Sequence, residues 1–169
     1  MITGLDLVRQ QILIAQGEKL SLPEPLMKGD RRAIQGHAIE ARIIAEDPSK
    51  GFLPSIGRIL GWAEPQGPGI RFDGGFQAGD EISQHYDSLI GKLIAHGATR
   101  DESASRLIAG LEDTHVLGVR TNIAFLHRLA SSETFERASF HTKWIDQEGQ
   151  GLLAEPEELP LELASLASA

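Results

Sequence analysis

Three charged side chains alternate along a hydrophobic segment in the first third of the chain. The segment reads GHAIEARIIAEDP from Gly36 to Pro48, and Glu40, Arg42 and Glu46 fall on one side of a period-two pattern to which Ile44 is the exception. The opposite side is apolar and comprises Ile39, Ala41, Ile43 and Ala45. The pattern predicts a β-strand with one core face and one polar face. An arginine beside two carboxylates can bind an anion or form exposed ion pairs of small energetic value, and spacing alone favours the ion pairs.

Other reactive side chains do not form a recognisable catalytic or metal motif. No two of the six histidines stand at the spacing of a two-ligand zinc motif. Leu53 stands where a nucleophile elbow around Ser55 needs its first glycine. Gly91-Lys92 is not a phosphate loop, because Tyr86 and Leu93 replace the required glycine and hydroxyl residue. Since cysteine is absent as well, we expect no metal site, disulfide or thiolate chemistry.

The remaining pattern predicts the elements that position the charged segment. Apolar residues at helical spacing predict helices near 4–16, 100–112 and 122–130, with N-caps at Thr3, Thr99 and Thr121 respectively. The stretch Ser88 to His96 is apolar on both faces, which is typical of a central strand. Shorter strands are predicted at 58–62, 70–72 and 116–119. We therefore expect an α+β fold in which an antiparallel sheet of short strands, between residues 36 and 97, curls around a core and is flanked by helices.

Composition limits the function classes. A chain of 169 residues fits one domain, and a formal net charge of -8 argues against nucleic acid or an anionic membrane as partner. No apolar run is long enough to span a membrane, and the N-terminus has no signal-peptide pattern, so a cytoplasmic protein is expected. After Gln147 the composition shifts to Glu, Leu, Ala and Ser with Pro156 and Pro160. This predicts a domain over residues 1–147 and a flexible tail or linker over 148–169.

Five separated motifs give a more specific indication. GHAIEARIIAEDP is followed by GFLPSIGRI, GIRFD from Gly69, HYDSLIGKLIAHG from His85 and GVRTN from Gly118. In this order and spacing they resemble the C-terminal domain of biotin carboxylases, and the opening ITGLDLV is similar too. The resemblance covers about residues 1–147, and an ordered set of motifs is more specific than any single one.

The resemblance implies roles for individual residues. Arg42 matches an arginine that contacts the biotin ureido oxygen and the bicarbonate-derived group, and is the expected catalytic and substrate-binding residue. Its guanidinium can bind an anion through two hydrogen bonds, which a lysine cannot do. Asp87 is expected to orient an arginine, either Arg42 in the substrate site or one across a dimer interface. Equally, it is expected to cap the following strand. Arg71 matches a dimer-contact arginine, although Pro68 replaces an aromatic residue there. Phe140 and His141 align with a segment that borders the ATP adenine, so they are the expected cofactor-binding residues.

The function implied is a share in ATP-dependent carboxylation of biotin, a ligase reaction. In the family an ATP-grasp domain binds ATP and magnesium, and biotin is attached to a separate carrier domain. The ATP-grasp motifs are absent from this sequence, so we expect the chain to be inactive alone and to bind neither cofactor by itself. Its expected partners are the ATP-grasp portion, the carrier domain and a second copy of the chain in a homodimer. An acyl-CoA carboxylase of fatty acid metabolism is favoured over carboxylases of pyruvate or urea. The alternative is a non-catalytic scaffold or regulatory protein that binds biotin carboxylase or its carrier domain.

Overall fold

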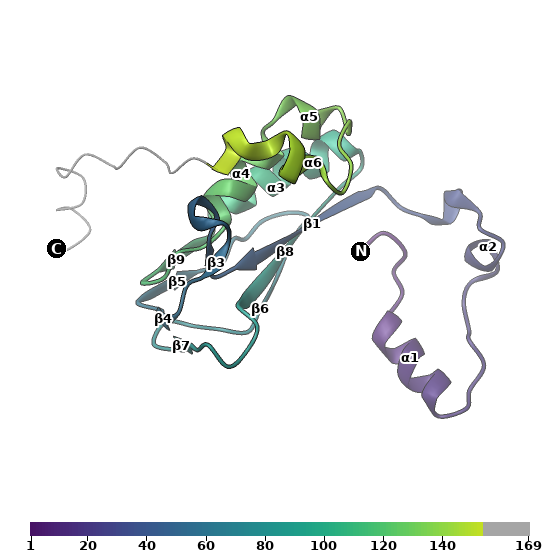
Figure 1. Cartoon of the computed structure of the whole chain (residues 1–169). Coiled ribbons are helices and arrows are strands. Elements are labelled where there is room, and N and C mark those ends of the chain that lie inside the picture. Colours follow the sequence, from purple (N-terminus) through teal and green to yellow (C-terminus); the bar gives the residue numbers. More distant parts are fainter. Residues whose placement is uncertain (154–169) are drawn as a thin grey trace.

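A three-stranded antiparallel sheet forms the centre of the computed structural model, which describes residues 1–153 (Figure 1). Its order is β1-β8-β6, with β1 at His37–Ile44, β8 at Leu89–Gly97 and β6 at Ile70–Gly74. The predicted central strand is therefore confirmed. β8 is central because its two faces are both apolar enough to be covered, whereas β1 and β6 each carry charged residues on one face.

The core lies between one face of this sheet and the helices. Alternate residues of β1 face inward, and Ala41, Ile43 and Ala45 are at most 5% exposed. Leu93 of β8 is opposite Ala41 and is fully buried beside Leu111 of the covering helix. The period-two pattern of the sequence thus identifies the core face of β1 correctly, because neighbouring side chains of a strand point to opposite faces.

Two helices cover that inner face (Figure 1). α3, Arg100–Glu112, packs across β8 and β1, and α4, Ile123–Ala130, packs against α3 and β1. The predicted cap of α3 is confirmed, since Thr99 Oγ1 accepts a hydrogen bond from Glu102 N at 3.2 Å. Two shorter helices follow, α5 at Glu133–Glu136 and α6 at Trp144–Gln147. Sequence periodicity did not predict them, because four residues are too few to show it.

Short two-stranded ladders extend the fold beside the main sheet. The pairs are β2 Glu46–Asp47 with β3 Leu53–Pro54, β4 Gly57–Arg58 with β7 Glu81–Ile82, and β5 Gly61–Ala63 with β9 His115–Leu117. A 3₁₀ turn, η2 at Pro48–Lys50, links β2 to β3.

The single strand predicted over 58–62 is wrong, because the chain changes partner in the middle of it. Ile59 N donates to Asp80 O beside β7, and the next residue, Leu60, donates from its N–H to Leu117 O of β9. Likewise the predicted 116–119 strand joins β5 and not the main sheet. The α+β class with short antiparallel strands is confirmed, but these strands form several small ladders.

The first 35 residues form an arm that extends away from the sheet (Figure 1). The arm contains α1 Leu7–Ala15, α2 Glu24–Met27 and the 3₁₀ turn η1 Arg31–Ala33. The N-cap of α1 is Asp6 and not the predicted Thr3, because Asp6 Oδ1 accepts from Arg9 N at 2.9 Å. The helix ends at Ala15, and Gly17 follows with a φ of 89°, a left-handed conformation that a side chain would disfavour. No residue of α1 is buried.

The C-terminal part of the described chain returns to α4. The 3₁₀ segment η3, Gly149–Leu153, follows α6, and Arg128 of α4 donates from Nε to Leu152 O at 2.9 Å. The predicted domain boundary after Gln147 stays a prediction, and most of the predicted tail, residues 154–169, lies outside the described residues. Within residues 1–153, no helix is long and apolar enough to cross a membrane.

The buried contact of β8 with α3 gives a stability prediction. Leu93→Ala removes a fully buried side chain and should lower the free energy of unfolding by about 2–5 kcal/mol, because it loses apolar burial and leaves a cavity. Leu60→Ala, at a leucine that is 72% exposed, should change it by less than about 0.5 kcal/mol. Urea unfolding of the full chain measures both, and equal losses would contradict the assigned core.

Candidate functional site

Arg42 lies on the outward face of β1 with its side chain exposed. Within residues 1–153, its guanidinium has no ion-pair or hydrogen-bond partner, whereas its backbone oxygen accepts a hydrogen bond from Asn122. The ion pair with Glu40 that spacing alone favours is therefore not formed. A permanently charged guanidinium with unused donors is suited to binding an anion from outside this part of the chain.

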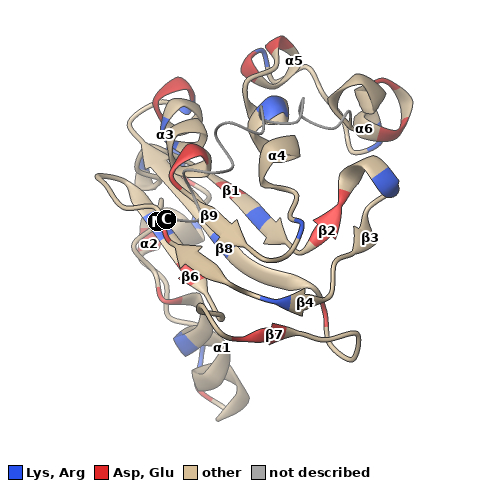
Figure 2. Cartoon of the chain, turned by 90° about the vertical axis from the view of Figure 1, so that its left-hand side faces the viewer, with Lys and Arg blue, Asp and Glu red and all other residues tan. Residues whose placement is uncertain are grey.

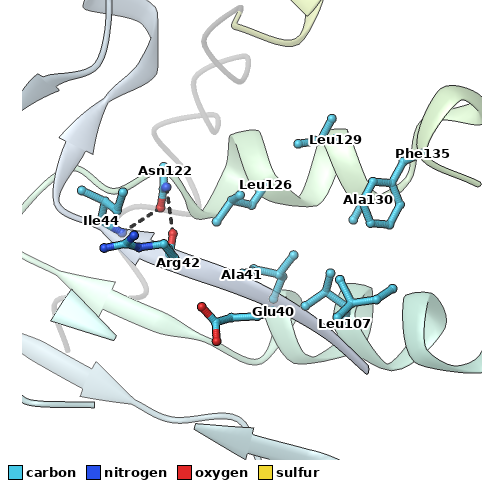
Figure 3. Close-up of a pocket in the computed structure, with 12 residues that line it drawn as sticks. Glu40, Ala41, Arg42, Ile44, Leu107, Asn122, Leu126, Leu129, Ala130 and Phe135 are labelled. Atoms are coloured by element: carbon cyan, nitrogen blue, oxygen red, sulfur yellow. Dashed lines mark hydrogen bonds between the residues drawn. The ribbon is translucent and has the colours of Figure 1, made fainter. Parts of the chain in front are cut away.

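Arg42 stands at one end of a pocket of about 260 Å³ between β1 and the helical layer (Figure 3). Glu40 and Asn122 supply the other polar lining groups. The rest of the lining is apolar: Ile39, Ala41, Ile44, Leu107, Leu111, Leu126, Leu129, Ala130 and Phe135. An apolar concavity with few convergent polar groups is the usual form of a small-ligand site.

Asn122 is a residue of this site that sequence reasoning missed. The sequence predicted Thr121 as the N-cap of α4, but the N-cap is Asn122, and its side chain makes no capping bond. Instead Nδ2 donates to Arg42 O at 3.0 Å and Oδ1 accepts from Ile44 N at 2.9 Å (Figure 3). The GVRTN motif contained the signal, yet a strand contact 78 residues distant cannot be deduced from local spacing.

The pKa values of two neighbouring carboxyl groups, Glu46 and Asp47, are shifted in opposite directions. Burial raises the pKa of the Glu46 carboxyl, and a hydrogen bond with the Asn122 side chain partly opposes the rise. The pKa of Asp47 is lowered, chiefly by the hydrogen bond from the Ser49 side chain, with further contributions from the positive charges of Arg120 and Lys50. Asp47 Oδ1 accepts from Ser49 Oγ at 2.6 Å. Asp47 therefore holds the turn after β2, while Glu46 belongs to the Arg42 neighbourhood.

The outward face of the sheet carries further charged residues on β8 and β6, and Figure 2 marks where charged residues fall along the strands. Arg42 is directly opposite Lys92 of β8, and Lys92 is in turn opposite Asp73 of β6. Arg71, the predicted interface residue, lies on this same face, and its Nε is 2.7 Å from Asp73 Oδ1. The structure thus brings Arg71 and Arg42 to one surface of the sheet.

Asp87 lies in the turn before β8 and is exposed. Its Oδ1 accepts a hydrogen bond from Leu89 N at 2.7 Å, which is the strand-start cap expected as the alternative role of this residue. No hydrogen bond or ion pair within residues 1–153 joins Asp87 to Arg42. Its role as a substrate-binding residue stays a prediction.

Phe140 and His141 follow α5, away from Arg42. The Phe140 ring is 46% exposed and stacks on Phe135 with centroids 5.5 Å apart. The guanidinium carbon of Arg100 lies over the Phe135 ring, 4.8 Å from the ring centroid. The exposed His141 accepts from Lys143 N at 3.3 Å through Nδ1. Since Phe135 also lines the Arg42 pocket, this aromatic stack lies next to it, and the adenine contact remains a prediction.

Comparison with known families identifies the domain. Residues 40–147 match the family described as Biotin carboxylase C-terminal domain. The chain belongs to this family. The matched range begins at Glu40 and ends at Gln147, so it contains Arg42, Asn122, Arg71 and the segment around Phe140.

Curated relatives of this biotin carboxylase C-terminal domain are longer proteins. The chain is 40% identical over 94% of its length to a pyruvate carboxylase subunit of Methanothermobacter thermautotrophicus, and 41% identical over 86% to biotin carboxylase 1 of Bacillus subtilis. It is 40% identical over 90% to the alpha subunit of the mitochondrial methylcrotonoyl-CoA carboxylase of Rattus norvegicus. The chain spans about a third or less of the length of these proteins: 31% of the pyruvate carboxylase subunit, 31% of biotin carboxylase 1 and 21% of the methylcrotonoyl-CoA carboxylase subunit.

Solved structures agree with the family assignment. The biotin carboxylase domain dimer of the 2-oxoglutarate carboxylase from Hydrogenobacter thermophilus, crystallised with MgADP, ADP and bicarbonate, matches with a TM-score of 0.82 and 38% identity. The match covers 93% of this chain and 33% of that one. The biotin carboxylase subunit of a pyruvate carboxylase matches equally, with a TM-score of 0.82 and 37% identity over 93% of this chain and 34% of that chain.

The raised pKa of Glu46 predicts a pH-dependent stability difference. Above the ordinary glutamate value the folded domain retains this proton more than the unfolded chain does, so the contribution of Glu46 to stability falls as pH rises through that window. The free energy of unfolding of wild type relative to Glu46→Gln should therefore increase when the pH is lowered from about 7.5 to about 4.5. Urea unfolding at both values measures it.

The lowered pKa of Asp47 gives a pH dependence of stability with the opposite sign. Asp47 is present in both wild type and Glu46→Gln, so its contribution cancels in the difference between their free energies of unfolding. Glu40→Gln removes an exposed carboxylate from the same strand and serves as the matched control. A wild-type to Glu46→Gln difference that is constant with pH, or that decreases on acidification, would contradict the assigned burial of Glu46.

Proposed function

We propose that this domain provides one wall of the biotin and bicarbonate site of a biotin carboxylase and contributes to its subunit contact. The observation that carries the proposal is the exposed guanidinium of Arg42, which has no partner within residues 1–153 and stands at the end of an apolar pocket. The relatives named biotin carboxylase support the reaction class. Relatives that are named for pyruvate and for methylcrotonoyl-CoA leave the final carboxyl acceptor open.

Arg42 is proposed to bind bicarbonate and to hold positive charge beside the biotin ureido oxygen. Two parallel N–H donors match the two oxygens of a carboxylate-like anion, and the charge of the guanidinium persists at any physiological pH. Electrostatic stabilisation of this kind is effective when the donors are already oriented before the reaction. Biotin, attached to a separate carrier domain, supplies the nitrogen that accepts the carboxyl group.

Asp87, Phe140 and His141 are proposed to act at the margins of this site. Asp87 is exposed and can reorient toward Arg42 when a substrate binds, although its hydrogen bond to Leu89 N would then be lost. Phe140 offers an exposed aromatic face on which an adenine ring can stack, with His141 beside it. ATP and magnesium are proposed to be held mainly by an ATP-grasp portion, with this stack as a boundary.

The ATP-grasp portion is the proposed partner of the N-terminal arm. The exposed apolar side chains of α1 are Leu7, Val8, Ile12 and Ile14, each 48% to 65% exposed. Burying them against a second region would remove apolar surface from water, at roughly 25 cal/mol per Å². The arm and the pocket would then both contribute to one assembly, with the isolated chain inactive.

The central test measures activity in an assembled enzyme. The full chain is mixed with the ATP-grasp portion of Bacillus subtilis biotin carboxylase 1, or joined to it in place of the matching segment, and bicarbonate- and biotin-dependent ATP hydrolysis is followed. Arg42→Ala should reduce kcat/KM by about 100- to 1,000-fold, as for loss of one oriented donor to a developing charge. Arg42→Lys should recover little of it, because lysine lacks the planar fork.

Arg58→Ala is the matched control, because Arg58 is an exposed arginine of β4 that lies outside both the arm and the pocket lining. It should retain wild-type turnover. If the assembled wild-type enzyme gains nothing over the ATP-grasp portion alone, the chain is not a catalytic partner, and a scaffold role is favoured. Wild-type rates for Arg42→Ala would instead remove Arg42 from the site while leaving the family assignment intact.

Arg71 is proposed to contribute to a contact between two copies. It lies on the open face of the sheet, 60% exposed, and its pairing with Asp73 holds the guanidinium near that face. Arg71→Glu puts like charges next to each other at Asp73 and should weaken self-association of the assembled enzyme by at least about tenfold in Kd. Sedimentation velocity over a concentration series measures this. Arg58→Glu, which puts like charges opposite each other at Glu81, is the control, and identical Kd values would exclude Arg71 from the contact.

A further inference from the structure

β1 has one edge without a partner strand among residues 1–153. Its other edge pairs with β8 along its whole length, and the sheet ends at β1. Arg42 O and Ile44 N face the open edge, because a carbonyl and the N–H two residues later point to the same side of a strand. An adjacent strand would bind both groups with one backbone N–H and one backbone C=O of its own.

The Asn122 side chain takes the place of those missing strand groups. Its Nδ2 donates to Arg42 O at 3.0 Å and its Oδ1 accepts from Ile44 N at 2.9 Å. The Asn122 backbone N–H also donates to Ile44 O at 3.1 Å. A primary amide presents one donor and one acceptor side by side, so no other residue type of this length reproduces both bonds.

The contact is located where the pairing with β8 is irregular. Between Ile43 and Ile44 the register of β1 against β8 shifts, so the ladder does not fix the backbone here as it does at Ala41. The Asn122 amide bridges the residues on either side of Ile43 from the opposite edge. Asn122 is 4% exposed and its backbone N–H is bonded to the same strand, so its amide is itself held in place.

We propose that Asn122 is a positioning residue for Arg42: by closing the free edge of β1 at the register shift, its amide fixes the backbone from which the guanidinium reaches the anion. This inference rests on the proposed function of Arg42. Asn122 lies at the N-terminus of α4, whose later residues Leu126 and Leu129 line the pocket, so the same bonds also fix the pocket wall relative to Arg42. A change of geometry of about 1 Å can cost a reaction about 100-fold.

A second side-chain hydrogen bond to the backbone of β1 provides the control. Ser103 of α3 is fully buried, and its Oγ donates to His37 O at 2.8 Å at the far end of β1. Ser103→Ala therefore removes a side-chain contact with the same strand without touching the backbone at Arg42. A purely structural role for Asn122 predicts that Asn122→Ala and Ser103→Ala behave alike at equal folded fraction.

The bond itself is tested in the full chain by NMR. Asn122 is the only asparagine in the sequence, so 15N-asparagine labelling gives one side-chain amide pair. Its two protons should exchange with solvent at least about tenfold more slowly than those of free asparagine. In Asn122→Ala the Ile44 amide should exchange at least about tenfold faster than in Ser103→Ala. Unprotected side-chain protons, or an unchanged Ile44 rate, would overturn the proposal.

The assembled enzyme described above tests the consequence for function, with rates normalised to folded protein. Asn122→Ala should lower kcat and raise KM for bicarbonate, in the same direction as Arg42→Ala and by about ten- to 100-fold in kcat/KM. Ser103→Ala should leave both constants unchanged. Asn122→Asp keeps the acceptor for Ile44 N–H but loses the donor to Arg42 O, and provides a second variant if the alanine variant folds poorly.

The outcomes separate the two hypotheses. If Arg42→Ala impairs turnover but Asn122→Ala and Asn122→Asp match Ser103→Ala, the positioning role is wrong and the proposed function stands. If Arg42→Ala retains wild-type rates, the proposed function fails and this inference fails with it. If turnover is lost in both the Arg42 and the Asn122 variants while Ser103→Ala stays active, the result supports both the proposed function and the positioning role of Asn122.

Discussion

The placement of Arg42 depends on the antiparallel pairing of β1 with the doubly covered strand β8. Ala41 and Ile43 are buried on the inner face of β1, and strand geometry then forces the residue between them outward. A slip of one residue in register would bury the guanidinium and expose Ala41 and Ile43, which is costly because a buried unpaired charge is strongly disfavoured. Hydrophobic burial on one face thus specifies charge presentation on the other.

The helical layer adds a second constraint that acts through backbone groups. α3 and α4 cover the inner face, but each also hydrogen-bonds the backbone of β1 with one polar side chain, Ser103 and Asn122. An exposed strand edge is a site for unwanted pairing. Asn122 occupies the open edge at Arg42 and Ile44, so α4 helps determine the orientation of β1 as well as its burial.

Sequence patterns predicted the parts of the fold that are governed by local periodicity. The core face of β1, the central position of β8 and the cap at Thr99 each follow from residues close together in the chain. The single strand predicted over 58–62 was wrong, because the segment is divided between β7 and β9 and both partners are supplied by distant residues.

The same distinction between local patterns and distant contacts applies to the candidate functional site. Arg42 was identified through its motif, and its exposure agrees with that prediction. Asn122 was missed because its side chain serves β1 and not the helix that it begins. A polar residue at a helix start is ordinarily interpreted as a cap, and only tertiary structure reveals that the amide is used elsewhere.

The electrostatics of the outer sheet face favour an incoming anion. Arg42 and Lys92 are directly opposite each other on β1 and β8, an arrangement of like charges that is destabilising in a sheet. Asp73, on the other side of Lys92, forms its ion pair with Arg71. The Arg42–Lys92 repulsion is therefore not offset by an ion pair to Arg42 within residues 1–153. An anion bound at Arg42 would relieve that repulsion, so this positive pair favours anion binding even on a chain whose formal net charge is -8.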